Sequence, residues 1–190
     1  MTSEAIKNMR KKQFIFINAV SFTVLMLYMV VVNYSGVNLS NLIFLLGAYL
    51  LIQSVYFLIK KDSTKSWIPI VEQVRTYEKE KMGKEWKRQN KASYVVNIFL
   101  GGFLMFQSSW FRDMNTEYSI DIRFFMVFII ALLVAINIML LLHAYKVDRS
   151  TNEADLKGYT WKTTLIGLVA GLLLAGVLIM VTVFYVLSTI

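Results

Sequence analysis

Long apolar runs separated by polar segments dominate the pattern of hydrophobic and polar positions along this chain. Five runs are found, over about residues 14–32, 42–59, 94–111, 124–145 and 165–190. A run of about 18 or more apolar residues exceeds an ordinary core helix and matches the hydrocarbon thickness of a bilayer. The pattern predicts an all-α polytopic membrane protein, in which residues 1–190 form one membrane domain built as a bundle of five transmembrane helices.

The distribution of helix-breaking residues supports helical spans. The single proline, Pro69, lies outside all five runs, and a spanning helix satisfies its own backbone hydrogen bonds. The run over 94–111 is the weakest, because it is short and contains Asn97, Gly101, Gly102 and Gln107.

Lys and Arg residues are unevenly distributed between the segments that join the runs. With the N-terminus inside, the inner side holds four basic residues before the first run, ten between Lys60 and Ser93 and four over 146–162, whereas the outer side holds Arg112 and Arg123. Cytoplasmic loops carry an excess of Lys and Arg. We therefore expect a multi-pass protein of the cell membrane with a cytoplasmic N-terminus and an extracytoplasmic C-terminus. Four crossings would leave the last basic loop outside, so five are preferred.

Composition agrees with this interpretation. Hydrophobic residues make up 57% of the 190 residues, the mean hydropathy is +0.56 and the net charge is +8. A basic excess can indicate nucleic-acid binding, but here the charges of both signs are mixed and no nucleic-acid-reading motif is present. The lipid bilayer, and not nucleic acid, is the expected partner of these basic residues.

The cytoplasmic segment over residues 60–93 is the most informative polar stretch. Its first half is amphipathic, with Ser66 as the predicted N-cap, Pro69 in the first turn and Gly83 loosening the helix near its middle. The apolar positions at helical spacing are Trp67, Ile70, Val71, Val74 and Tyr77. One interpretation is an interfacial helix on anionic lipid, with Trp67 and Trp86 among the headgroups.

A compatible interpretation of this segment is a docking surface for a cytosolic or membrane protein. Mixed charge would orient the partner, and the apolar side chains would anchor it. The predicted partner-binding residues are Trp67, Val74, Tyr77, Lys81, Trp86 and Arg88.

Small residues recur every fourth position in the last run, at Gly167, Gly171 and Ala175. Such a stripe allows helices to approach closely in lipid. It predicts helix packing, either against another helix of the same chain or against a second copy in a homodimer.

Several amides lie inside the runs: Asn18, Gln53, Asn97, Gln107 and Asn137. Buried amides usually hydrogen-bond to a neighbouring helix, and the alternative is a polar path for a substrate. No Asp, Glu, Lys or Arg lies near the centre of a run, which counts against an ion-coupled carrier.

Candidate catalytic and metal-binding residues are scarce. His143 is the only histidine and cysteine is absent, so we predict no metal site. Asp113, Glu117 and Asp121 would share one face if the loop between the third and fourth runs were helical. Known hydrolase, protease and phosphate-binding motifs are missing, so we predict no catalytic residues and no cofactor. A lipid-modifying enzyme would need an acid–base cluster at one interface, for which the sequence offers only scattered candidates.

The chain begins with a basic head and an uncharged hairpin, continues with the charged stretch IVEQVRTYEKEKMGKEWKRQNKAS and ends with three further runs. This layout resembles that of the small polytopic membrane proteins of Gram-positive bacteria. Some of these are encoded beside helix-turn-helix or LytTR-type regulators and restrain them. The resemblance implies a non-enzymatic regulator-sequestering or immunity-type protein that binds a partner through its 60–93 segment. The alternative function is a transporter, a channel or an accessory subunit of a membrane transport complex.

Overall fold

The structure is a computed structural model that describes all residues except 35–37, 61–62, 112–121 and 190. Every regular element in the described part of the chain is helical. The elements are α1 (Ser3–Tyr34), α2 (Leu39–Lys60), α3 (Pro69–Met82), α4 (Lys84–Phe111), α5 (Ile122–Arg149), the 3₁₀ helix η1 (Glu153–Leu156) and α6 (Tyr159–Thr189). The predicted all-α class is therefore confirmed for these residues.

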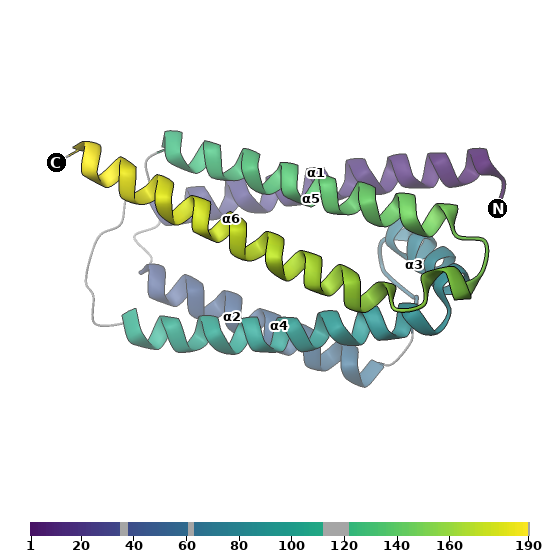
Figure 1. The fold of residues 1–190 in the computed structure, drawn as a ribbon. Helices are drawn as coiled ribbons and strands as arrows, with labels where there is room; N and C mark the ends of the chain where they lie inside the picture. Colours follow the sequence, from purple (N-terminus) through teal and green to yellow (C-terminus); the bar gives the residue numbers. More distant parts are fainter. Residues whose placement is uncertain (35–37, 61–62, 112–121, 190) are drawn as a thin grey trace.

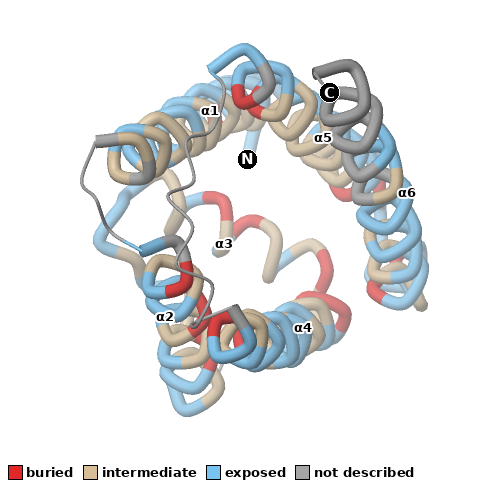
Figure 2. Tube along the Cα trace, turned by 90° about the vertical axis from the view of Figure 1, so that its left-hand side faces the viewer, coloured by how far each residue is buried: buried red, intermediate tan, exposed pale blue. Residues whose placement is uncertain are grey.

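The long helices α1, α2, α4, α5 and α6 run roughly side by side, and the short helix α3 lies across one end of them (Figure 1). The N-terminus lies at the α3 end, whereas α6 runs toward the opposite end. Viewed along the bundle, the long helices surround the position of α3 (Figure 2).

The long helices present apolar side chains outward. Ile52, Phe99 and Leu173 are 71%, 76% and 67% exposed, respectively, which would be costly in water. Three stretches are long and apolar enough to cross a membrane: Ser3–Val31, Ser40–Lys60 and Phe125–Arg149. Because apolar faces of this length need an apolar solvent, the structure supports a membrane protein with at least these candidate spans.

Helices α2 and α4 form the closest pair, and two glycines allow their approach. A Cβ atom at Gly47 would lie 2.8 Å from the carbonyl oxygen of Gly101, and a Cβ at Gly101 would lie 2.8 Å from the carbonyl oxygen of Gly47. At one end of the pair, the Ser108 hydroxyl donates to the Ser40 carbonyl oxygen at 2.8 Å. In the sequence alone Gly101 only weakens its apolar run, whereas in the structure its missing side chain lets two backbones approach closely.

The 60–93 segment divides into two helices at Gly83. This residue has φ of +52°, a conformation that glycine adopts readily and other residues rarely do. Beyond it, α4 continues without interruption from the charged stretch into the run predicted for 94–111. The prediction of Ser66 as N-cap was wrong by two positions: Ile68 is the N-cap and Pro69 is the first helical residue, where proline loses no hydrogen bond. The acidic trio Asp113, Glu117 and Asp121 lies outside the described residues.

Candidate functional site: the cap at the α3 end

The main apolar core of the described protein lies at the α3 end of the bundle. We call this region the cap, and define it as α3, η1 and the segments 3–13, 84–93, 143–152 and 157–162 that pack around them. Its buried residues come from five elements and are Met9, Val74, Tyr77, Met82, Trp86, Val147 and Leu156. The sequence-predicted apolar face of α3 therefore packs against other helices of the same chain.

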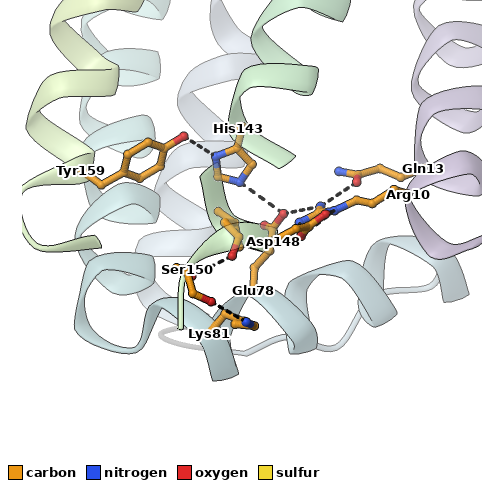
Figure 3. Close-up of polar contacts among 9 residues, drawn as sticks. Arg10, Gln13, Glu78, Lys81, His143, Asp148, Ser150 and Tyr159 are labelled. Atoms are coloured by element: carbon orange, nitrogen blue, oxygen red, sulfur yellow. Dashed lines mark hydrogen bonds and ion pairs between the residues drawn. The ribbon is translucent and has the colours of Figure 1, made fainter. Parts of the chain in front are cut away.

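A polar cluster crosses this core and is centred on Arg10 of α1 (Figure 3). The Arg10 guanidinium donates to Oδ1 of Asp148 at 2.8 Å and to Oε1 of Glu78 at 2.7 Å, and its Nη1 also donates to Oε1 of Gln13 at 2.8 Å. Its side chain is only 12% exposed. One planar cation thus joins α1, α3 and α5, a geometry that suits arginine because its donors form a fixed fork.

His143 extends the cluster to α6. Its Nε2 lies 3.2 Å from Oε1 of Glu78, and its Nδ1 lies 3.0 Å from the hydroxyl of Tyr159 (Figure 3). Burial opposes the charge on Glu78, but hydrogen bonds and charge from His143 and Arg10 outweigh burial and hold the pKa of this carboxyl below its ordinary value. Glu78 is therefore an anion held between two partners.

Two further contacts fix α3 in the cap. The Lys81 ammonium donates to the backbone carbonyl oxygen of Ser150 at 2.7 Å, and the Arg10 guanidinium lies 5.4 Å from the ring centre of Tyr77. Burial, with the nearby charge of Asp148 adding to it, raises the pKa of Tyr77 to about 12. Tyr77 is therefore a neutral core residue near neutral pH.

A second polar contact holds the beginning of α6. The carboxylate of Glu85, which is buried, accepts hydrogen bonds from the Thr160 hydroxyl at 2.8 Å and from the backbone N–H groups of Gly158 and Thr160 at 3.3 Å each. These bonds, together with Arg88 at 2.7 Å, overcome the burial of Glu85 and lower its pKa. An anion near the first turn of α6 is favourable because free N–H groups and the helix dipole meet there.

The groups of the Arg10 cluster bind one another and so connect helices. Both ring nitrogens of His143 are engaged, Nδ1 by the Tyr159 hydroxyl and Nε2 by Oε1 of Glu78. The same Oε1 also accepts a hydrogen bond from Arg10. Within the described ranges, no three His, Cys, Asp or Glu side chains are grouped so that they could hold a metal ion. Of the scattered acid–base candidates, His143 does meet other ionisable groups at this end of the bundle, where it is a partner of Glu78 and Tyr159.

The six predicted partner-binding residues fall into two groups. Val74, Tyr77 and Trp86 are buried in the cap, and Lys81 is engaged by Ser150. Trp67 is fully exposed, and the Arg88 side chain is 66% exposed. A partner-binding role stays a prediction for all six, but in this conformation only the last two lie at the surface.

The predicted small-residue stripe on α6 is not a place of close approach within the described chain. A Cβ at Gly167 would meet the Met139 side chain at 3.5 Å, and one at Gly171 would meet nothing within 4 Å. The side chain of Ala175 lies outside the described residues. A dimer contact through this stripe stays a prediction.

The cluster of Arg10, Glu78 and Asp148 was not predicted from the sequence, where Arg10 counted only among the basic residues that set the topology and the two acidic residues were given no role. One signal was available: Glu78 follows Val74 by four positions, which places a carboxylate on the apolar face of an amphipathic helix. Its partners come from distant helices and leave no comparable local pattern.

Comparison with known proteins adds no further information. No protein family, no curated protein and no solved structure matches this chain.

Proposed function

We propose that the chain is a cell-membrane protein with five spans, α1, α2, α4, α5 and α6, and that the cap lies in the cytoplasm. Among the described residues, stretches of α1, α2 and α5 are long and apolar enough to span a membrane, and α4 and α6 run alongside these helices (Figure 1). Of the 20 basic residues, 18 belong to the segments that this topology leaves inside. The positive-inside rule favours this orientation.

Cysteine labelling tests the topology directly, since the natural chain contains no cysteine. With a membrane-impermeant maleimide on intact cells, we expect Thr116→Cys to react and Ala154→Cys to react only after permeabilisation. The unchanged chain is the background control. The opposite pattern, or reaction of both positions in intact cells, would refute the proposed orientation.

We further propose that the protein is non-enzymatic and binds a partner protein through the cap, as a regulator-sequestering or immunity-type protein. The observation that carries this proposal is Trp67, which is fully exposed at the entry to α3. The neighbouring outward positions of α3 are Pro69, Gln73, Thr76 and Glu80. Tryptophan is enriched among residues that dominate binding energy, so an exposed one beside a polar helix face suits a protein contact.

The anchoring of α3 supports this role. Its inner face is held by the apolar core and by the Arg10 cluster, so its outer face is presented by a fixed scaffold. A preorganised surface loses less conformational entropy on binding than a free amphipathic segment.

Photo-crosslinking in native membranes tests the contact. We would place a photoreactive phenylalanine analogue at Trp67 or Thr76. Phe99 is the control, because its side chain is also aromatic and exposed but lies within a predicted span. A discrete protein adduct is expected at positions 67 and 76 only. Trp67→Ala should lower the adduct yield at position 76 by about tenfold, as for a hot-spot residue. If position 67 reacts only as position 99 does, the protein contact is rejected.

The transport alternative has less support. Asn18 and Asn137, two of the five amides that would line a polar path, hydrogen-bond to each other. Gln53, Asn97 and Gln107 are half-buried on α2 and α4.

A further inference from the structure

A basic groove lies between the end of α2 and the beginning of α4, on the cap side of the bundle. Its volume is about 260 Å³. Lysines, two small polar residues, and apolar or aromatic residues line it: Lys60, Lys65, Lys87, Lys91, Ser63, Asn90, Phe57, Leu58, Trp86 and Tyr94. None of these described lining residues is acidic.

Two of the aromatic residues that line the groove stack on each other. The rings of Phe57 and Tyr94 lie 5.7 Å apart and almost parallel, at 7°. Two more cations lie close to aromatic lining residues without lining the groove themselves: Arg75 lies 5.4 Å from the ring centre of Phe57, and Lys79 lies 5.5 Å from that of Trp86. The lining of the groove therefore combines a concentration of positive charge with apolar and aromatic side chains.

The position of the groove along the bundle indicates which kind of ligand it meets. Phe57 and Tyr94 lie at the inner ends of the runs 42–59 and 94–111, where aromatic side chains meet lipid headgroups. The surface there is that of the cytoplasmic leaflet, which carries anionic lipids and attracts basic segments. This placement rests on the topology proposed above.

We infer that this groove binds one anionic phospholipid. The lipid phosphate would lie among the Lys65, Lys87 and Lys91 ammonium groups, and the glycerol and first acyl carbons would lie along Leu58 and the stacked rings. A lipid fits better than a soluble phosphate because Phe57, Leu58 and Tyr94 give the groove an apolar lining and because the proposed topology puts the groove beside the membrane surface. The inferred site is distinct from the outward face of α3 that is proposed to bind a protein.

Lipid retention by the purified full-length protein tests the inference. The protein in detergent would be titrated with phosphatidylglycerol or phosphatidylcholine and the bound lipid counted by native mass spectrometry. The test variant is Lys65→Gln/Lys87→Gln/Lys91→Gln. The matched control is Lys7→Gln/Lys11→Gln/Lys12→Gln. It removes the same number of charges from three exposed lysines at the N-terminal end of α1, which also lies at the cap.

The unchanged protein and the control should retain one phosphatidylglycerol in preference to phosphatidylcholine. Because the test variant removes the three ammonium groups that would lie around the lipid phosphate, it should bind phosphatidylglycerol at least about tenfold more weakly. If both triple variants bound phosphatidylglycerol equally weakly, the preference would come from diffuse charge and the inferred site would be refuted. Equal affinity of the unchanged protein for the two lipids would also refute it. Displacement of the lipid by inorganic phosphate at the same concentration would mean a free-anion site and would also overturn the inference.

Two measurements keep these outcomes interpretable. Melting temperatures of both triple variants in phosphatidylcholine show whether either has lost its fold, and single Lys91→Gln and Lys12→Gln variants replace any that has. Cysteine labelling reports orientation independently of lipid, so a failed lipid preference and a failed topology are told apart.

Discussion

Asn18 of α1 and Asn137 of α5 exchange two hydrogen bonds of 2.7 Å each, with each side-chain amide donating to the oxygen of the other. The second hydrogen of each amide goes to the carbonyl oxygen four residues earlier, Phe14 or Leu133, at 2.8 Å. Every N–H donor of the two side chains is therefore used within these two helices, and the pair links α1 to α5.

Replacing one amide of this pair should lower the free energy of unfolding by more than half of the loss that results from replacing both. Asn18→Leu or Asn137→Leu leaves the other amide unsatisfied in an apolar setting and should lower stability by about 1 kcal/mol. The double variant should cost less than the sum, because no unpaired amide remains. Thermal unfolding of the four proteins in one detergent measures this coupling, and strictly additive losses would contradict the pairing.

Adjacent glycines on α4 should differ sharply in their tolerance of a methyl group. Gly101→Ala would bring a Cβ to 2.8 Å from the Gly47 carbonyl oxygen, whereas Gly102→Ala would meet nothing within 4 Å. We expect Gly101→Ala to force α2 and α4 apart at a cost of about 1–3 kcal/mol. Gly102→Ala should be neutral or slightly stabilising, since alanine favours a helix. Equal melting temperatures for the two variants would argue against this crossing.

Removing the cation at the centre of the cap should be strongly destabilising. Arg10→Gln would leave Glu78 and Asp148 without their shared partner, at a cost of about 3 kcal/mol. Arg10→Lys should recover only part of the loss, because a single ammonium cannot reproduce the fork. Lys7→Gln removes the same charge from an exposed position and should change little. Protease sensitivity of the cap and thermal unfolding are suitable readouts, and a full rescue by lysine would contradict the geometric argument.

Stability should fall in acid because of Glu78. Its folded-state pKa lies below the ordinary value of 4.5, so the ionised form is favoured by folding. The contribution is complete above the unfolded-state pKa and is lost as the pH falls through the folded-state pKa. Glu78→Gln should therefore lower stability at neutral pH and flatten its decline below about pH 4.5. Glu80→Gln, at an exposed position of the same helix, should leave the acid decline unchanged. Melting temperatures between pH 3 and 7 compare the two, and parallel curves for both would count against Glu78.

The hydropathy pattern alone predicted the helical class and located the apolar runs. The described parts of all five runs are helical in the structure, and three long apolar stretches meet the requirements of a span. The periodicity of α3 also placed Val74 and Tyr77 on one apolar face, and both are buried. These successes share a reason: hydropathy and helical period are local properties that follow from side-chain chemistry and from the geometry of one helix.

Only the tertiary structure shows which helix packs against each face of another helix. Arg10 meets Glu78 and Asp148 from positions 68 and 138 residues away, and Gly47 meets Gly101 only because α2 and α4 pack in one register. The same apolar face of α3 could have met a partner, as the sequence suggested for Tyr77, or the chain's own helices, as it does. Local pattern cannot distinguish these outcomes, because an apolar stripe loses about the same contact with water whichever surface covers it, and only the packing of distant helices supplies that surface.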